Sequence, residues 1–236
     1  MKLLLTSGGL RNARLLDALG ELVGRPFAAA NVVYIATASM AEPGDHSWVL
    51  QDLARVHGLG WRQFDVLELN GLPPTLVRDR LLQADVIYVS GGNHYHLARS
   101  ITGNNLTGIF LEALESRVYV GLSAGSMIFS RHLTEHAAEV IGDAADLHLL
   151  GATTVEAPFG LFDWYLKPHL YSPDFPERDD AWADAIAARA DFPIYFIDDD
   201  TAVRVDDTQV DVVSDGRWRL HPHDATISPS LPPAPA

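Results

Sequence analysis

Short apolar runs alternate with amphipathic stretches through the first half of the chain, and this alternation constrains the fold more than any other feature. The runs are apolar throughout, without the polar alternation of half-exposed strands, so they predict strands buried on both faces. The predicted strands cover residues 3–6, 32–36, 64–69, 86–89 and 118–122. The predicted helices between them cover residues 14–22, 46–57, 73–83 and 106–114. This order predicts an α/β fold with a mostly parallel sheet sandwiched by helices.

The second half is less regular and predicts a small antiparallel β extension near the C-terminus. A helix is expected over 178–189, followed by short strands at 194–197, 202–205, 210–213 and 217–220. Asp215-Gly216 is a favourable hairpin turn between the last two strands. We expect one domain over 1–220 and a proline-rich, disordered tail over 221–236.

Charge and composition narrow the function classes. The 236 residues are 47% apolar and carry a net charge of −14, which disfavours nucleic acid and anionic membranes as partners. There are no cysteines, so a thiolate zinc site and a cysteine nucleophile are excluded. The apolar N-terminal run is too short for a signal peptide, and no stretch approaches a membrane span. We expect a cytoplasmic protein, and a homodimer is compatible with the sequence.

The strongest motif is Gly121-Leu122-Ser123-Ala124-Gly125, directly after the predicted strand 118–122. In a parallel sheet, ligands bind beyond the carboxyl ends of the strands. A strand, a tight turn with small residues and a following helix form the context of a nucleophile elbow. Ser123 is therefore the candidate nucleophile, and the backbone N–H of Ala124 is a candidate oxyanion donor.

A second glycine-rich turn, Ser90-Gly91-Gly92-Asn93, follows the predicted strand 86–89. Paired glycines let a substrate approach the backbone closely and leave N–H groups free. If the strands 86–89 and 118–122 lie close together in the sheet, Gly91 or Gly92 supplies the second oxyanion donor.

A serine nucleophile needs a base and an orienting carboxylate. His169 follows a short apolar run and is the preferred base, with His94 and His96 as rivals. His132 and His136 have a helical spacing that suits a metal, but Glu135 does not fit the zinc-protease motif, so we expect a solvated face and no metal. The remaining histidines considered are His148, with a structural role, and His221 and His223, beside the tail.

The sequence offers several candidates for the orienting acid. Asp198, Asp199 and Asp200 immediately follow the predicted strand 194–197. Asp143 and Asp163 are the alternatives.

Taken together, these segments resemble the peptidase E family of serine peptidases, which includes the cyanophycinases. The resemblance covers about residues 2–220 and rests on four segments in the family's order. They are Gly91-Gly92-Asn93, Ser123-Ala124-Gly125, Pro168-His169 and Asp199-Asp200-Thr201-Ala202. It implies a fold like that of the class I glutamine amidotransferases and a triad of Ser123, His169 and Asp199. The family acid is usually glutamate, so Asp198 remains an alternative, and His94-Tyr95 replaces the family's usual Thr-Phe.

The resemblance also implies a substrate. Peptidase E prefers dipeptides with N-terminal aspartate and reads that carboxylate with an arginine beyond the catalytic histidine. Arg178 is the nearest candidate here, although Glu177, Asp179 and Asp180 offer it surface ion pairs. Asn93 is the second expected substrate-binding residue. No metal or organic cofactor is implied.

Three other functions remain open. The first is an esterase of the α/β-hydrolase type, which would need His221 or His223 as base. The second is a cyanophycinase-like hydrolase of β-aspartyl peptides. The third is a non-catalytic binding protein on the same fold.

Overall fold

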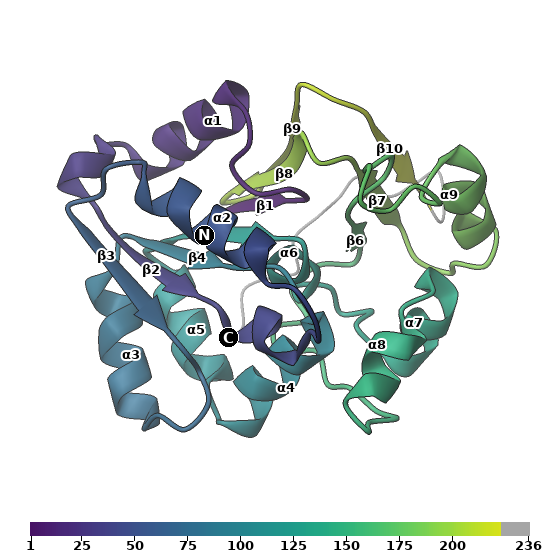
Figure 1. Ribbon diagram of the computed structural model, residues 1–236, viewed down its shortest axis with the longest axis horizontal. Coiled ribbons are helices and arrows are strands. Elements are labelled where there is room, and N and C mark those ends of the chain that lie inside the picture. Colours follow the sequence, from purple (N-terminus) through teal and green to yellow (C-terminus); the bar gives the residue numbers. More distant parts are fainter. Residues whose placement is uncertain (223–236) are drawn as a thin grey trace.

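The computed structural model describes residues 1–222 and contains the expected mostly parallel sheet between two layers of helices (Figure 1). The main sheet has seven strands in the order β3-β2-β4-β5-β1-β8-β9. Its five parallel strands are β1 (Lys2–Thr6), β2 (Asn31–Ile35), β3 (Gln63–Leu67), β4 (Val86–Val89) and β5 (Val118–Leu122). The antiparallel strands β8 (Thr201–Asp206) and β9 (Gln209–Ser214) extend the sheet beside β1.

Helices cover both faces of this sheet and divide its core into two clusters. On one face, α1 (Ala13–Val23) and α2 (Ser47–His57) pack against apolar side chains that include Leu4 and Val120. The other face is covered by α3 (Pro74–Gln83), α4 (His94–Gly103) and α5 (Thr107–Leu114). Burial of both faces explains why the strands are apolar at successive positions.

A second, three-stranded sheet lies beside the carboxyl ends of the main parallel strands (Figure 1). It consists of β6 (Tyr165–Lys167), β7 (Ile194–Ile197) and β10 (Trp218–His221), in the order β10-β7-β6. β6 runs parallel to β7, and β10 runs antiparallel to β7.

The prediction of a hairpin at Asp215-Gly216 is wrong. β9 and β10 belong to different sheets, and the chain crosses between them at this turn. The backbone N–H of Arg217 donates to the Asp198 carboxylate, which ties the turn to the acidic segment after β7. The tight hairpin instead joins β8 to β9, with Asp207 at a φ of 52°.

The short helix α6 (Ala124–Met127) follows Ser123, as expected for the elbow. Two further short helices, α7 (Glu135–Ile141) and α8 (Ala144–Leu149), were not expected from the sequence. The helix α9 (Asp180–Ala187) occupies most of the range predicted for it, and the 3₁₀ helices are Phe27–Ala29 and Thr37–Ala41. His132 precedes α7, so it does not share a helix with His136.

The predicted tail begins at His221, which instead belongs to β10. The rest of the tail prediction, residues 223–236, falls outside the described residues. Within residues 1–222, no helix has both the length and the apolar character needed to cross a bilayer.

Candidate active site

Ser123 lies at the sharp turn between β5 and α6. Its backbone has φ 47° and ψ −105°, a sparsely populated region for a residue with a side chain. The turn is closed by the N–H groups of Ser126 and Met127, which donate to the Ser123 carbonyl at 2.8 and 3.2 Å. A Cβ atom at Gly125 would lie 2.5 Å from the Val89 carbonyl oxygen, so only glycine lets α6 pack this closely on β4. These features are those of a nucleophile elbow.

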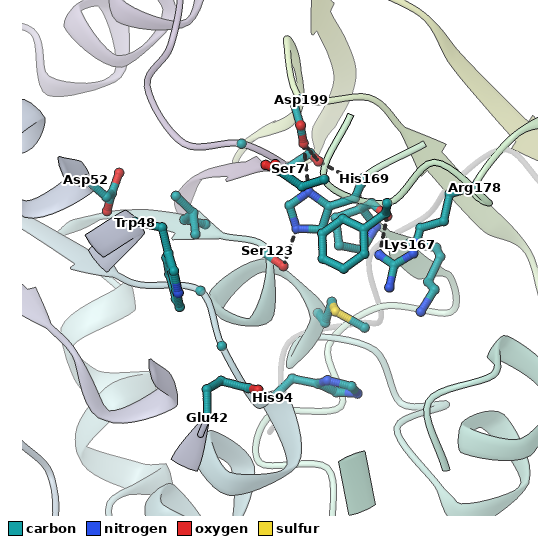
Figure 2. A pocket seen from close by; sticks show the side chains of 18 of the residues that line it. Ser7, Glu42, Trp48, Asp52, His94, Ser123, Lys167, His169, Arg178 and Asp199 are labelled. Atoms are coloured by element: carbon teal, nitrogen blue, oxygen red, sulfur yellow. Dashed lines mark hydrogen bonds and ion pairs between the residues drawn. The ribbon is translucent and has the colours of Figure 1, made fainter. Parts of the chain in front are cut away.

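The side chains of Ser123, His169 and Asp199 form a continuous hydrogen-bonded chain (Figure 2). The distance from Ser123 Oγ to His169 Nε2 is 2.9 Å, and that from His169 Nδ1 to Asp199 Oδ1 is 2.7 Å. Both lie within the range that a hydroxyl, a base and an orienting acid require. The arrangement allows the imidazole to accept the serine proton while the carboxylate stabilises the resulting charge.

Two different sheets supply this chain of groups. Ser123 follows β5 of the main sheet, whereas His169 and Asp199 follow the parallel neighbours β6 and β7 of the small sheet. His169 has a φ of 67°, and its backbone N–H donates to Ser7 Oγ at 2.8 Å. Its ring stacks on Phe175 with 4.8 Å between centroids. The site therefore lies where the two sheets meet, and both backbone and ring contacts fix the imidazole.

The Asp199 carboxylate has three further partners. Oδ1 also accepts from Ser7 Oγ at 3.0 Å, Oδ2 accepts from Ser172 Oγ at 2.6 Å, and Arg11 Nη1 lies 3.2 Å from Oδ2. Burial alone would raise the pKa of Asp199. The hydrogen bond and charge of His169, helped by Ser172 and Ser7, outweigh burial and hold that pKa well below its usual range.

The neighbouring aspartates have other partners. Asp198 Oδ1 accepts from Thr201 Oγ1 at 2.6 Å and from the Asp200 N–H at 3.2 Å, so it stabilises the turn itself. Asp200 is exposed, and its backbone carbonyl accepts from Asn12. Of the alternative acids, Asp143 pairs with Lys167, and Asp163 pairs with Arg131 and His132.

The glycine turn after β4 faces the elbow, because β4 and β5 are adjacent parallel strands. Gly91 and Gly92 line the same pocket as Ser123, and Gly92 has a φ of 125° that L side chains rarely adopt. Within residues 1–222, no turn or loop hydrogen bond uses the N–H of Gly91, Gly92 or Ala124. These three backbone donors are thus available near the serine hydroxyl.

A pocket of about 580 Å³ surrounds Ser123, a volume typical of small-molecule sites. One side of it carries Arg178, which was expected from the sequence, and Lys167, which was not. Lys167 is buried, and its ammonium donates to Asp143, while Arg178 lies 3.9 Å from the centre of the Phe175 ring. Arg178 Nε is 3.7 Å from Glu177, but its side chain is only 17% exposed and lines the pocket.

Asn93 has a structural role in the fold. Its Oδ1 accepts from the His96 N–H and caps α4, and its Nδ2 donates to the Asp146 carbonyl, each at 2.9 Å. The side chain is fully buried. It is also absent from the lining of the pocket around Ser123, so its expected substrate-binding role stays a prediction.

His94 is the residue closest to a metal-ligand arrangement. His94, Asp143 and Asp146 bring ligand atoms within 4.8 Å of one another, and His94 Nε2 is buried without a hydrogen-bond partner. The Lys167 ammonium already occupies an oxygen of Asp143 and supplies the positive charge that a metal would bring. Burial lowers the pKa of His94 to about 4, so the ring is neutral at pH 7. Because Lys167 is already bound to Asp143, the donor set fits a lysine-neutralised cluster better than a metal centre.

The fold and this hydroxyl–imidazole–carboxylate chain are those of a serine hydrolase built on an α/β sheet. The chain belongs to peptidase family S51, a serine peptidase family, whose sequence model matches residues 3–213. It is 24% identical over 176 residues to an uncharacterised peptidase of Pasteurella multocida, which covers 74% of this chain and 81% of the relative.

Two solved structures share the fold. A proposed peptidase E protein from Listeria monocytogenes EGD-e superposes with a TM-score of 0.70 at 21% identity, covering 90% of this chain and 98% of that one. A peptidase from an acI-B1 actinobacterium superposes with a TM-score of 0.63 at 19% identity, covering 98% of this chain and 93% of that one. The expected peptidase E-like architecture is thus confirmed.

Proposed function

We propose that this protein is a dipeptidase that hydrolyses small peptides with N-terminal aspartate through an acyl-enzyme on Ser123. The observation that carries the proposal is the hydrogen-bonded chain from Ser123 Oγ through His169 to Asp199, at 2.9 and 2.7 Å. A cytoplasmic location is part of the same proposal.

The reaction has two halves. His169 Nε2 takes the proton of Ser123 Oγ as the oxygen attacks the scissile carbonyl, and the N–H groups of Ala124 and of Gly91 or Gly92 bind the oxyanion. His169 then gives the proton to the leaving amine. Water, deprotonated by His169, then attacks the ester, and His169 returns this proton to Ser123 Oγ as the ester bond breaks and the free acid leaves.

The proposed reader of the aspartyl side chain is Arg178. Its guanidinium lies against Phe175, which in turn stacks on His169, so it faces the pocket beside the nucleophile. The planar guanidinium suits a carboxylate, and its side chain is largely removed from solvent.

The esterase alternative places the base on His221 or His223. His221 lies in β10 and is absent from the lining of the pocket around Ser123, and His223 lies outside the described residues. Removing residues 223–236 should therefore leave peptidase activity unchanged, whereas the esterase alternative loses a candidate base.

A panel of dipeptides with varied first residues, run on the wild type and on Ser123→Ala, tests the proposal. We expect Asp-Leu to be the preferred substrate and the variant to lose at least about 10⁴-fold in kcat. Arg178→Met should lower kcat/KM for Asp-Leu by about 10- to 100-fold and leave Ala-Leu unchanged. Equal turnover by wild type and Ser123→Ala would refute the mechanism, and preference for β-aspartyl peptides would favour the cyanophycinase-like alternative.

A further inference from the structure

The pocket has a second charged side, which the proposed mechanism does not use. In Figure 2, Trp48 and Asp52 lie on one side of Ser123, and Lys167 and Arg178 lie on the other. Arg11 and Arg55 line the pocket as well. These two arginines add cationic groups to a pocket that carboxylates also line.

Each of these arginines is anchored by a carboxylate that already has other partners. Arg11 Nη1 lies 3.2 Å from Asp199 Oδ2, and Arg55 Nη1 lies 3.5 Å from Asp52 Oδ1. Asp52 is buried and accepts from the hydroxyls of Tyr34 and Tyr88, both at 2.9 Å. Each carboxylate therefore positions its guanidinium while occupying few of the N–H donors of that guanidinium.

Most guanidinium donors of this pair remain available. An arginine has five N–H donors, and within residues 1–222 the only partners of the two guanidiniums are these carboxylates. The side chains of Arg11 and Arg55 are 42% and 39% exposed. They are thus open to a ligand that enters the pocket.

The turn after β1 brings the two anchors together. A Cβ atom at Gly8 would lie 2.9 Å from the Asp199 Cβ, and one at Gly9 would lie 3.1 Å from Asp52 Oδ1. Asp199 and Asp52 therefore flank one turn, and both of the arginines that they anchor line the pocket.

The leaving residue of a peptide must come close to this place. Its nitrogen has to reach His169 Nε2 to receive the proton, and Asp199 lies directly across that imidazole ring. In a dipeptide the carboxylate carbon is two bonds from this nitrogen, about 2.5 Å away. An anionic group is thus presented within a few ångströms of the ring, inside the pocket that Arg11 and Arg55 line.

We propose that Arg11 and Arg55 bind the free α-carboxylate of the leaving residue and so restrict the enzyme to dipeptides. A longer peptide has a neutral amide at this point, which leaves the two cations without an anion. Trp48, 38% exposed at the same side, offers an aromatic surface for the side chain of the leaving residue. This inference rests on the proposed peptidase function, but binding measurements test it separately.

The direct test uses Ser123→Ala, which holds the substrate without cleaving it. Calorimetry should show that Asp-Leu binds at least about 10-fold tighter than Asp-Leu amide, because a charge-assisted contact is lost with the carboxylate. Adding Arg55→Gln should reduce this ratio to within about twofold. Arg55 is chosen because it does not contact the Ser123–His169–Asp199 chain.

The control is Arg14→Gln, which alters an arginine that pairs with Asp215 outside the pocket and should leave the ratio unchanged. The proposal is overturned if the amide binds as tightly as the dipeptide, if neither binds, or if Arg55→Gln weakens both equally.

A turnover experiment separates the two proposals. Asp-p-nitroanilide has a leaving group without a carboxylate, so Arg55→Gln should lower kcat/KM for Asp-Leu about 10-fold and leave the anilide within about twofold. Equal loss on both substrates would contradict the carboxylate site. A wild type that cleaves neither would refute the dipeptidase function, whereas the binding ratio would still decide the inference.

Discussion

Asp199 is held by more groups than its proposed role of orienting an imidazole requires. His169, Ser172, Ser7 and Arg11 all contact its carboxylate. The contacts with His169, Ser172 and Ser7 keep the pKa of Asp199 below its usual range, so the group is ionised throughout the neutral range. An ionised acid fixes one tautomer of His169, with the proton on Nδ1 and the lone pair of Nε2 toward Ser123. In the proposed mechanism, the hydroxyls of Ser7 and Ser172 therefore influence catalysis through Asp199.

Ser7 links the acid to the backbone of the base, because its Oγ donates to Asp199 and accepts from the His169 N–H. Ser7→Ala should lower kcat by about 10-fold, since a hydrogen bond to a charged group contributes about 1.5–3 kcal/mol. KM should change little. Steady-state kinetics on Asp-Leu, with the buried Ser100→Ala of α4 as control, checks this. A wild-type kcat for Ser7→Ala would show that the link is dispensable.

Replacing Asp198 and Asp199 by asparagine, one at a time, separates the roles of these two neighbours. Asp199→Asn should lower kcat by about 10⁴-fold, because the amide favours the wrong tautomer of His169. Asp198→Asn should keep kcat and lower Tm, because Asp198 stabilises the turn through Thr201 and Arg217. The reverse pattern would assign the acid to Asp198.

At the scale of elements, the site depends on how closely α6 approaches β4. Gly125 is in contact with the Val89 carbonyl, and Tyr119 of β5 donates to the Gly125 carbonyl at 2.7 Å. Contacts with both β4 and β5 thus fix the elbow, and they maintain the unusual backbone angles of Ser123. Strain of this kind persists only where the surroundings enforce it.

Gly125→Ala should destabilise the protein by about 1–3 kcal/mol, because a methyl group there overlaps the Val89 carbonyl. Gly20→Ala is the matched control. Gly20 lies inside α1 with nothing within 4 Å of an added Cβ, so the change should stabilise by about 0.5–1 kcal/mol. Urea unfolding measures both, and equal effects would contradict this packing.

The sequence predicted those elements whose structure is determined by residues close together in the chain. β4 and β5 have the bounds expected from their uniform apolarity, and Ser123 was recognisable from the strand and small residues around it. The pairing of β10 with β7 depends on contacts distant in sequence, so the nearby Asp215-Gly216 turn suggested the wrong partner. Ser7 and Ser172 carry no local signal of their role, apart from the position of Ser7 after β1.

At the scale of the whole molecule, buried charges join the two halves of the structure. Lys167 at the end of β6 pairs with Asp143 before α8, and His94 at the start of α4 lies 4.0 Å from the same carboxylate. The cost of burying these groups makes stability dependent on pH. Only the fold shows that residues so far apart in sequence share one cavity, so their cluster could not be predicted.

Acid should destabilise the protein through His94. Its pKa falls from about 6.5 to about 4 on folding, because of burial. The unfolded chain therefore binds this proton first, and the free energy of unfolding should drop by roughly 3 kcal/mol as pH falls from about 6.5 to 4. His94→Leu removes the group, so its unfolding free energy should fall by less over this range. The free energies of unfolding of both proteins are measured with urea at pH 7 and 4.5. An equal decrease for the wild type and His94→Leu would contradict this role of His94.

The most direct test of the account is the site of covalent labelling by a serine-directed fluorophosphonate, measured by intact mass and peptide mapping. We predict one adduct, on Ser123, formed by the wild type and absent from His169→Ala, because the hydroxyl is a nucleophile only while the imidazole accepts its proton. An adduct on another residue, or equal labelling of Ser123 without His169, would contradict it.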